Sequence, residues 1–140
     1  MSDTNEAVVR RFVHEVLNEG DYSAMRELVH TDYVYRSPDR ELNGPEALED
    51  LLTAYRTGLP DMNTSVDDLV VSGDKVVISI TLTGTHTGDL MGIPATGRRL
   101  SVHGMVLSRL EDERIVEERE VLDTFGMYQQ LGVISLPSGR

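Results

Sequence analysis

The strongest candidate for chemistry in this sequence is Asp123. It follows the apolar pair Val121-Leu122 and precedes Phe125. A carboxylate among apolar side chains must be paired, hydrogen-bonded or protonated, because burial disfavours its charged form. Such a group can take up and return a proton near neutral pH. The competing interpretation is a helix N-cap, since aspartate is favoured there and a helix is expected to begin at Thr124.

Two histidines could assist Asp123. If residues 111–113 form a three-residue turn, His103 lies opposite Val121 and its ring stands beside Asp123, on the same face as Met105. A slip of one residue would place His103 on the other face of the strand. His86 continues the apolar side of a predicted strand and is expected at the rim of a cavity. For both histidines, the alternative is a buried ring satisfied by a hydrogen bond.

Several other side chains are expected to contact a ligand. Tyr33 and Tyr35 are two residues apart in a short predicted strand, so they face the same way and could offer a phenol to a carbonyl oxygen. Ordinary packing is the alternative for both. Met91, in a long loop, is expected to belong to a lid or to a subunit interface. The predicted ligand contacts are Tyr33, Tyr35, Phe12, Tyr55, Met91, Met105 and Arg119.

Composition and motifs argue against several function classes. The net charge of −11 disfavours a nucleic-acid or anionic-membrane partner. The 4 histidines show no metal-ligand spacing, so we expect no metal. Neither a nucleophile elbow nor a phosphate-binding glycine loop occurs, which argues against covalent catalysis and nucleotide cofactors. No segment approaches the ~18–20 apolar residues that span a bilayer, and no secretory signal is recognisable, so we expect a cytoplasmic protein.

The helices and strands that must position these residues are distinguished by a change in the hydrophobic period near residue 63. Apolar spacing of three and four residues predicts helices over 5–19, 21–29, 45–57 and from 124 onward. Alternation with a period of two predicts strands over 64–71, 76–82, 99–110 and 114–122. A brief strand is predicted over 33–35 and a long loop over 88–97.

This order of elements predicts an α+β domain. We expect a curved, mostly antiparallel sheet with three N-terminal helices on its concave face. The space between them is a cone-shaped cavity suited to a small apolar ligand. One domain is expected over residues 1–140, with its core over about 5–132 and a frayed tail over 133–140.

A series of short motifs runs along most of the chain, over roughly residues 8–132. They are Asn18-Glu19-Gly20-Asp21, Leu59-Pro60-Asp61, Gly84-Thr85-His86-Thr87-Gly88, Pro94-Ala95-Thr96-Gly97-Arg98, Arg114-Ile115-Val116-Glu117, Asp123 and Gln129-Gln130-Leu131-Gly132. In this order and spacing the chain resembles the SnoaL-like polyketide cyclases, within the nuclear-transport-factor-2-like (ketosteroid-isomerase-like) superfamily.

The resemblance implies a cone-shaped α+β barrel, a homodimer or tetramer, and a reaction that uses neither cofactor nor metal. Cyclases of this family close a ring by intramolecular aldol condensation of a polyketide ester. By resemblance, Asp123 would take a proton α to a carbonyl and return it to the new alkoxide, assisted by His103, His86 or a tyrosine. Where the family often has tryptophan, this chain has Arg119, and an Arg119–Asp123 pair would lower the pKa of the aspartate.

Two other functions stay open at this point. The chain could be a non-catalytic module that binds an apolar metabolite, or an isomerase or hydrolase that keeps Asp123 but changes its partners. An Asp123 that faces the cavity with His103 in reach favours an enzyme. An Asp123 that caps the last helix, beside a cavity filled by methionine and leucine, favours binding.

Overall fold

The N-terminal segment is a long helix whose winding changes partway. The structure, a computed structural model, describes residues 2–135. Helix α1 (Ser2–Arg11) leads directly into η1 (Phe12–Asn18), a π-helical stretch. Buried residues recur at the spacing that predicted this helix: Val8, Val9, Phe12, Val13 and Val16. The chain then turns at Gly20, whose φ of 70° is a conformation that favours glycine.

Two shorter helices follow as predicted. Helix α2 (Tyr22–Leu28) is capped by Asp21, whose carboxylate accepts hydrogen bonds from the backbone N–H groups of Ser23 and Ala24, each at 3.1 Å. Helix α3 (Pro45–Gly58) starts with proline in its first turn, where the missing N–H has no helical partner to lose. Its inward side buries leucines 48, 51 and 52.

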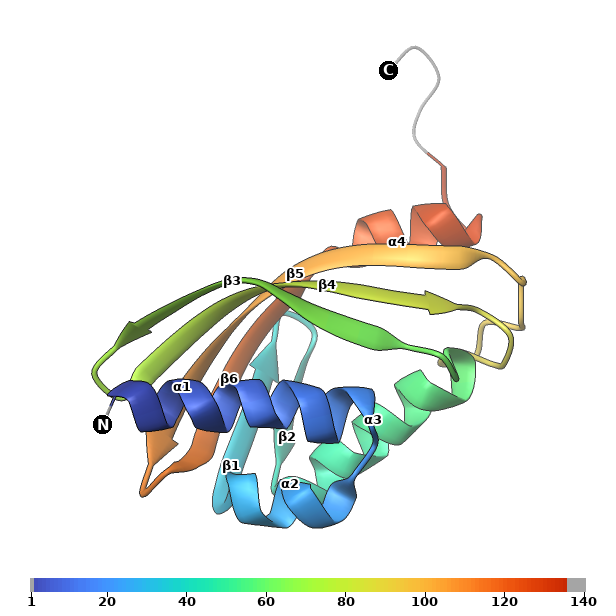
Figure 1. Ribbon diagram of the computed structural model, residues 1–140. Helices are drawn as coiled ribbons and strands as arrows, with labels where there is room; N and C mark the ends of the chain where they lie inside the picture. The colour runs from blue at the N-terminus through green and yellow to red at the C-terminus, as the bar shows by residue number, and fades with distance from the viewer. Residues whose placement is uncertain (1, 136–140) are drawn as a thin grey trace.

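The strands form one curved sheet, with helices α1 to α3 on one side of it (Figure 1). The strands are β1 (Val29–Ser37), β2 (Arg40–Asn43), β3 (Asn63–Ser72), β4 (Lys75–Thr85), β5 (Arg99–Glu111) and β6 (Arg114–Leu122). Their order is β2-β1-β6-β5-β4-β3, in which only β1 and β6 pair in parallel. The α+β class is therefore confirmed, but the sheet is open, with β2 and β3 as its edges, and the barrel is not closed.

The β5–β6 hairpin differs from the predicted register. Its turn consists of Asp112 and Glu113 alone, both at positive φ (51° and 64°), rather than of three residues. Leu110 consequently pairs with Ile115, and an irregularity beside this pair shifts the ladder again. Met105 takes the place opposite Val121 that was predicted for His103.

The last helix, α4 (Thr124–Leu131), covers one end of the sheet. It buries Met127 and Leu131 in a second apolar cluster that includes Leu100 and Val102 of β5. None of the helices within residues 2–135 is long and apolar enough to cross a membrane. Of the tail expected over 133–140, residues 136–140 lie outside the described part of the chain.

Candidate functional site

An apolar cavity lies between the helices and the inner face of the sheet. Its wall comprises Val9, Phe12, Val13, Leu17, Tyr35, Leu48, Leu51, Leu52, Tyr55, Met62, Thr64, Ile78, Ile80, Leu82, Val106, Glu118, Glu120 and Leu122. This wall combines a large hydrophobic surface with a few polar groups, which is the usual composition of a small-molecule site.

The cavity contains two carboxyl groups from the same strand. Glu118 and Glu120 are two residues apart on β6, so both side chains reach the inner face. Glu118 is buried, with 7% of its surface exposed, whereas Glu120 is half-buried. Carboxyl groups in such a place are candidates for proton transfer.

Each carboxyl group is hydrogen-bonded by a tyrosine of β1. The Tyr33 hydroxyl donates to Oε1 of Glu118 at 2.6 Å, and the Tyr35 hydroxyl donates to Oε1 of Glu120. Both bonds follow from the parallel pairing of β1 with β6, in which Tyr35 is the register partner of Glu118. The fold thus places two tyrosine–glutamate pairs side by side.

Burial is the main influence on the pKa of both glutamates. It raises the pKa of Glu118 to about 7, against the opposing hydrogen bond from Tyr33 and with the help of the negative charge on Glu120. Burial also raises the pKa of Glu120, although the Tyr35 hydrogen bond stabilises its carboxylate and lowers the pKa in part. Both groups can therefore exchange protons closer to neutral pH than an exposed glutamate does.

A more polar opening adjoins the cavity at Glu120. The two spaces share the walls formed by Tyr35, Leu51, Tyr55, Glu120 and Leu122. The opening adds polar and apolar side chains from the β1–β2 turn, the 88–97 loop and α4: Ser37, Pro38, Asp39, Arg40, Met91, Thr124, Met127 and Tyr128. Glu120 thus lies at the boundary between the apolar cavity and the more polar space beside it.

Asp123 lies outside both spaces. Its side chain is exposed and caps α4, accepting a hydrogen bond from the backbone N–H of Gly126 at 2.9 Å. The expectation of a carboxylate surrounded by apolar side chains is wrong, because β6 has ended and the chain has turned into the helix. The N-cap interpretation is the one that the geometry supports.

His103 is on the outer face of the sheet. It is exposed, and its Nδ1 is 3.1 Å from the hydroxyl of Thr81 on β4. It shares a face with Met105, as predicted, but this face is turned away from the cavity, and 55% of Met105 is exposed. The expected positions of His103 and Met105 in the site are therefore wrong.

His86 is fully buried but does not reach the cavity wall. Its Nδ1 accepts a hydrogen bond from the backbone N–H of Thr96 at 3.2 Å, so the proton resides on Nε2, which donates to the carbonyl of Ile93 at 3.2 Å. His86 holds the 88–97 loop in place, which is the structural alternative that the sequence left open.

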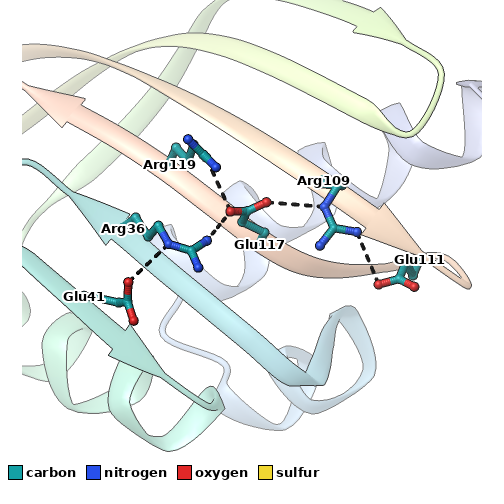
Figure 2. A network of polar contacts seen from close by, with 6 residues as sticks. All are labelled: Arg36, Glu41, Arg109, Glu111, Glu117 and Arg119. Carbon is teal, nitrogen blue, oxygen red and sulfur yellow. Dashed lines mark hydrogen bonds and ion pairs between the residues drawn. The ribbon is translucent and has the colours of Figure 1, made fainter.

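Arg119 also lies away from the cavity. Figure 2 shows it with Arg36 and Arg109 around Glu117. Glu117 alternates with Glu118 and Glu120 along β6 and so lies on the opposite face of the strand. The Nε of Arg119 is 3.3 Å from Oε2 of Glu117, so the expected pairing with Asp123 is replaced by this one. Burial alone would raise the pKa of Glu117, but the three guanidinium groups lower it below its ordinary value.

The aromatic part of the predicted site does lie together. Phe12, Tyr35 and Tyr55 line the cavity, Met91 lines its opening, and Tyr33 supports Glu118 from behind. The sequence reasoning missed Glu118 and Glu120. The signal was weak, because by a period of two these acids share a strand face with the apolar Val116 and Leu122 but also with Arg114.

No cluster of three or more metal-ligating side chains occurs within residues 2–135. The two glutamates and two tyrosines of the cavity offer hydrogen bonds and proton transfer.

Comparison with known proteins places the chain in a family. The profile described as SnoaL-like polyketide cyclase matches residues 7–131. Aklanonic acid methyl ester cyclase DnrD of Streptomyces peucetius is 33% identical over 129 residues, covering 89% of this chain and 88% of its own length. Cyclase DauD of Streptomyces sp. (strain C5), named for the same substrate, is 32% identical and covers 89% and 80%.

The fold agrees with solved structures. TsrD from Streptomyces laurentii superposes with a TM-score of 0.86 at 29% identity, covering 96% of this chain and 98% of that chain. The similarity extends over nearly the whole domain, and the two curated relatives are cyclases. The cyclase-like, enzymatic character expected from the sequence is thereby confirmed, and this chain belongs to the SnoaL-like polyketide cyclase family.

Proposed function

We propose that the protein closes a ring in a polyketide ester by intramolecular aldol condensation, with Glu120 as the acid/base. The observation that carries this proposal is the position of Glu120, between the apolar cavity and its polar opening, with a raised pKa and a tyrosine on one oxygen. The names of the two curated relatives, both cyclases of a polyketide methyl ester, supply the substrate class.

The chemistry requires one proton carrier. Glu120 takes a proton from the carbon α to a carbonyl, and the resulting enolate attacks a second carbonyl of the same molecule, forming the new C–C bond. The alkoxide left by this attack then takes the proton back from Glu120. Atoms and charge balance, so the product is an isomer of the substrate.

Tyr55 is suited to stabilise the enolate. It lines both the cavity and the opening, and within the described residues its hydroxyl has no hydrogen-bond partner in the protein. Burial raises the pKa of Tyr55 to about 12, so the hydroxyl stays protonated and can donate to an enolate oxygen. Tyr35, in contrast, is already engaged with Glu120 and holds that carboxylate in place.

The test uses purified protein and aklanonic acid methyl ester in D₂O. Chromatography follows the isomeric product, and mass spectrometry of the recovered substrate follows deuterium that enters at the α carbon when the enolate is reprotonated there before it attacks. Glu120→Gln is expected to lower kcat/KM by about 10²–10⁴-fold, the usual contribution of a positioned acid/base. Asp123→Asn is the matched control, because it removes a carboxylate that lies outside both spaces.

The outcomes separate the possible functions. Loss of activity in Asp123→Asn with full activity in Glu120→Gln would return the catalytic role to Asp123. Binding of the ester without product or deuterium uptake would favour the non-catalytic module. Deuterium uptake without ring closure would favour an isomerase in the same cavity.

A further inference from the structure

The cavity holds a second acid, Glu118, which the proposed reaction does not use. It is the more deeply buried of the two, and its only neighbour of the same charge within the wall is Glu120. Tyr33 donates to its Oε1 at 2.6 Å. The protonation state of a carboxyl group that is buried and hydrogen-bonded by a tyrosine therefore needs a physical explanation.

The groups that face Glu118 carry no compensating charge. They are Tyr33 and Tyr35 of β1, Ser108 of β5 and Glu120 of β6. The remaining wall, supplied by α1, η1, α3, β3 and β4, includes Tyr55 as its one other titratable side chain and no basic residue, all of it within the described chain.

The opening adds charges only at the Glu120 end. Arg40 and Asp39 line it together with Tyr128, and none of these three reaches the cavity wall that contains Glu118. Two negative charges in the cavity would therefore repel each other at short range in surroundings of low polarity.

We propose that Glu118 is a positioning residue that stays protonated while Glu120 carries the single negative charge of the cavity, and that ionisation of Glu118 at alkaline pH stops the reaction. The assignment of which acid keeps the proton follows from burial, because Glu120 borders the opening and Glu118 does not. The kinetic part of this inference rests on the proposed function.

Ser108 can accept a hydrogen bond from protonated Glu118. It lies opposite Glu118 in the β5–β6 register, and its buried hydroxyl makes no hydrogen bond of normal geometry within the described residues. It is nevertheless close enough to lower the pKa of Glu118. A protonated Glu118 can accept from Tyr33 on one oxygen and donate to Ser108 from the other.

The consequence for the reaction is electrostatic. With Glu118 neutral, Glu120 can take a proton and the cavity then holds one negative charge, on the enolate. Once Glu118 is ionised, the enolate would form beside a second negative charge, which raises its energy. Because burial raises the pKa of Glu118 to about 7, activity should decline above that pH.

The decisive variant is Glu118→Gln, since glutamine is neutral at every pH and keeps both an acceptor for Tyr33 and a donor for Ser108. The measurement is the ratio of kcat/KM at pH 9 to that at pH 7. We expect about 0.1 or less for the wild type and a ratio near 1 for Glu118→Gln. Glu113→Gln, an exposed change in the β5–β6 turn, should keep the wild-type ratio. An unchanged ratio in Glu118→Gln overturns the proposal.

A second variant, Tyr33→Phe, tests the direction in which the pKa of Glu118 shifts when its hydrogen bond is removed. The Tyr33 hydrogen bond stabilises the carboxylate of Glu118 and so lowers its pKa. Tyr33→Phe should therefore move the alkaline decline to higher pH without abolishing it. A decline that moves to lower pH contradicts the assignment.

A measurement without substrate separates this inference from the proposed function. In infrared spectra at pH 6, the carbonyl band of a protonated carboxyl group should be present in the wild type and lost in Glu118→Gln. Absence of the band from the wild type overturns the protonation of Glu118, whatever the activity. Presence of the band in a protein that cyclises no ester supports the charge assignment and overturns the proposed function.

Discussion

At the scale of single residues, the site depends on which face of β6 a carboxylate occupies. Glu118 and Glu120 point inward to tyrosines, whereas Glu117 points outward to three arginines. Burial raises the pKa of the inner acids, and the guanidinium groups lower that of Glu117. Neighbouring residues of one type thus acquire opposite ionisation behaviour from their surroundings alone.

Glu118 should make the stability of the protein depend on pH. Its folded-state pKa of about 7 lies above the reference value of 4.5, so its contribution is complete below about pH 4.5 and is lost as pH rises through 7. We expect Glu118→Gln to be more stable than the wild type at pH 8 by about 3 kcal/mol, with little difference at pH 5. Urea unfolding at both pH values measures this, and equal differences at the two would contradict it.

Asp123 should matter for stability and not for turnover. Replacing it with alanine removes the acceptor for the Gly126 N–H, so the free energy of unfolding should fall by about 1 kcal/mol. Asp123→Asn, which can still cap the helix, should change it by only a few tenths of a kcal/mol. Thermal unfolding of both variants, with kcat/KM measured in parallel, checks this. A large loss of kcat/KM at full stability would contradict it.

The sequence pointed to β6 and its end, but it did not show which carboxylates face the cavity, for a physical reason. On β6, charged residues occupy both faces, so alternation could not show which side is buried. Asp123 was selected from its apolar neighbours in sequence, but those neighbours alternate in direction and the strand ends before it. Tyr33 and Tyr35 were placed correctly because a spacing of two residues in a strand fixes a shared face.

At the scale of elements, the sequence predicted most accurately the helices and strands whose apolar residues recur with a clear period. The helices and strand β4 each have one predominantly apolar face, and they lie where the sequence predicted them. Strand β5 has apolar residues on both faces, so its inner side was ambiguous. Strand β2, four residues long with mostly exposed side chains, carries no hydrophobic signal and was not predicted.

Two substitutions in the β5–β6 turn should increase the stability of the protein. Asp112 and Glu113 both have positive φ, which is unfavourable for residues with a side chain, whereas Asn-Gly is preferred in such two-residue turns. The double variant Asp112→Asn/Glu113→Gly should raise the free energy of unfolding by about 1 kcal/mol. Denaturant titration measures the gain. A loss of stability would mean that the turn does not adopt this conformation in solution.

At the scale of the whole molecule, the homodimer expected from the resemblance stays a prediction, and the outer sheet face is where we would test it. Met105 and Val121 are 55% and 60% exposed there. Beside them, three arginines balance three glutamates: Arg36, Arg109, Arg119, Glu41, Glu111 and Glu117 (Figure 2). In a chain of net charge −11, a face whose charges balance and which also exposes apolar side chains is where two copies repel each other least.

Val121→Glu should therefore convert a dimer into a monomer, because it places a further negative charge on that face of both copies. Sedimentation velocity over a range of concentrations measures the association. Val133→Glu, an exposed valine that follows α4 and lies outside the sheet, is the matched control and should leave association unchanged. A wild type that stays monomeric throughout contradicts the prediction.

The parallel pairing of β1 with β6 also determines when the cavity can exist during folding. Each tyrosine–glutamate pair joins residues 85 positions apart, so neither pair can form until most of the chain is available. Closing so long a loop loses much chain entropy before any contact offsets it, and folds dominated by distant contacts form slowly. Early folding intermediates should therefore contain the N-terminal helices and the β3–β4 hairpin but no ligand-binding space. The appearance of ligand binding should accordingly be among the last events of refolding, and it should coincide with the docking of β6.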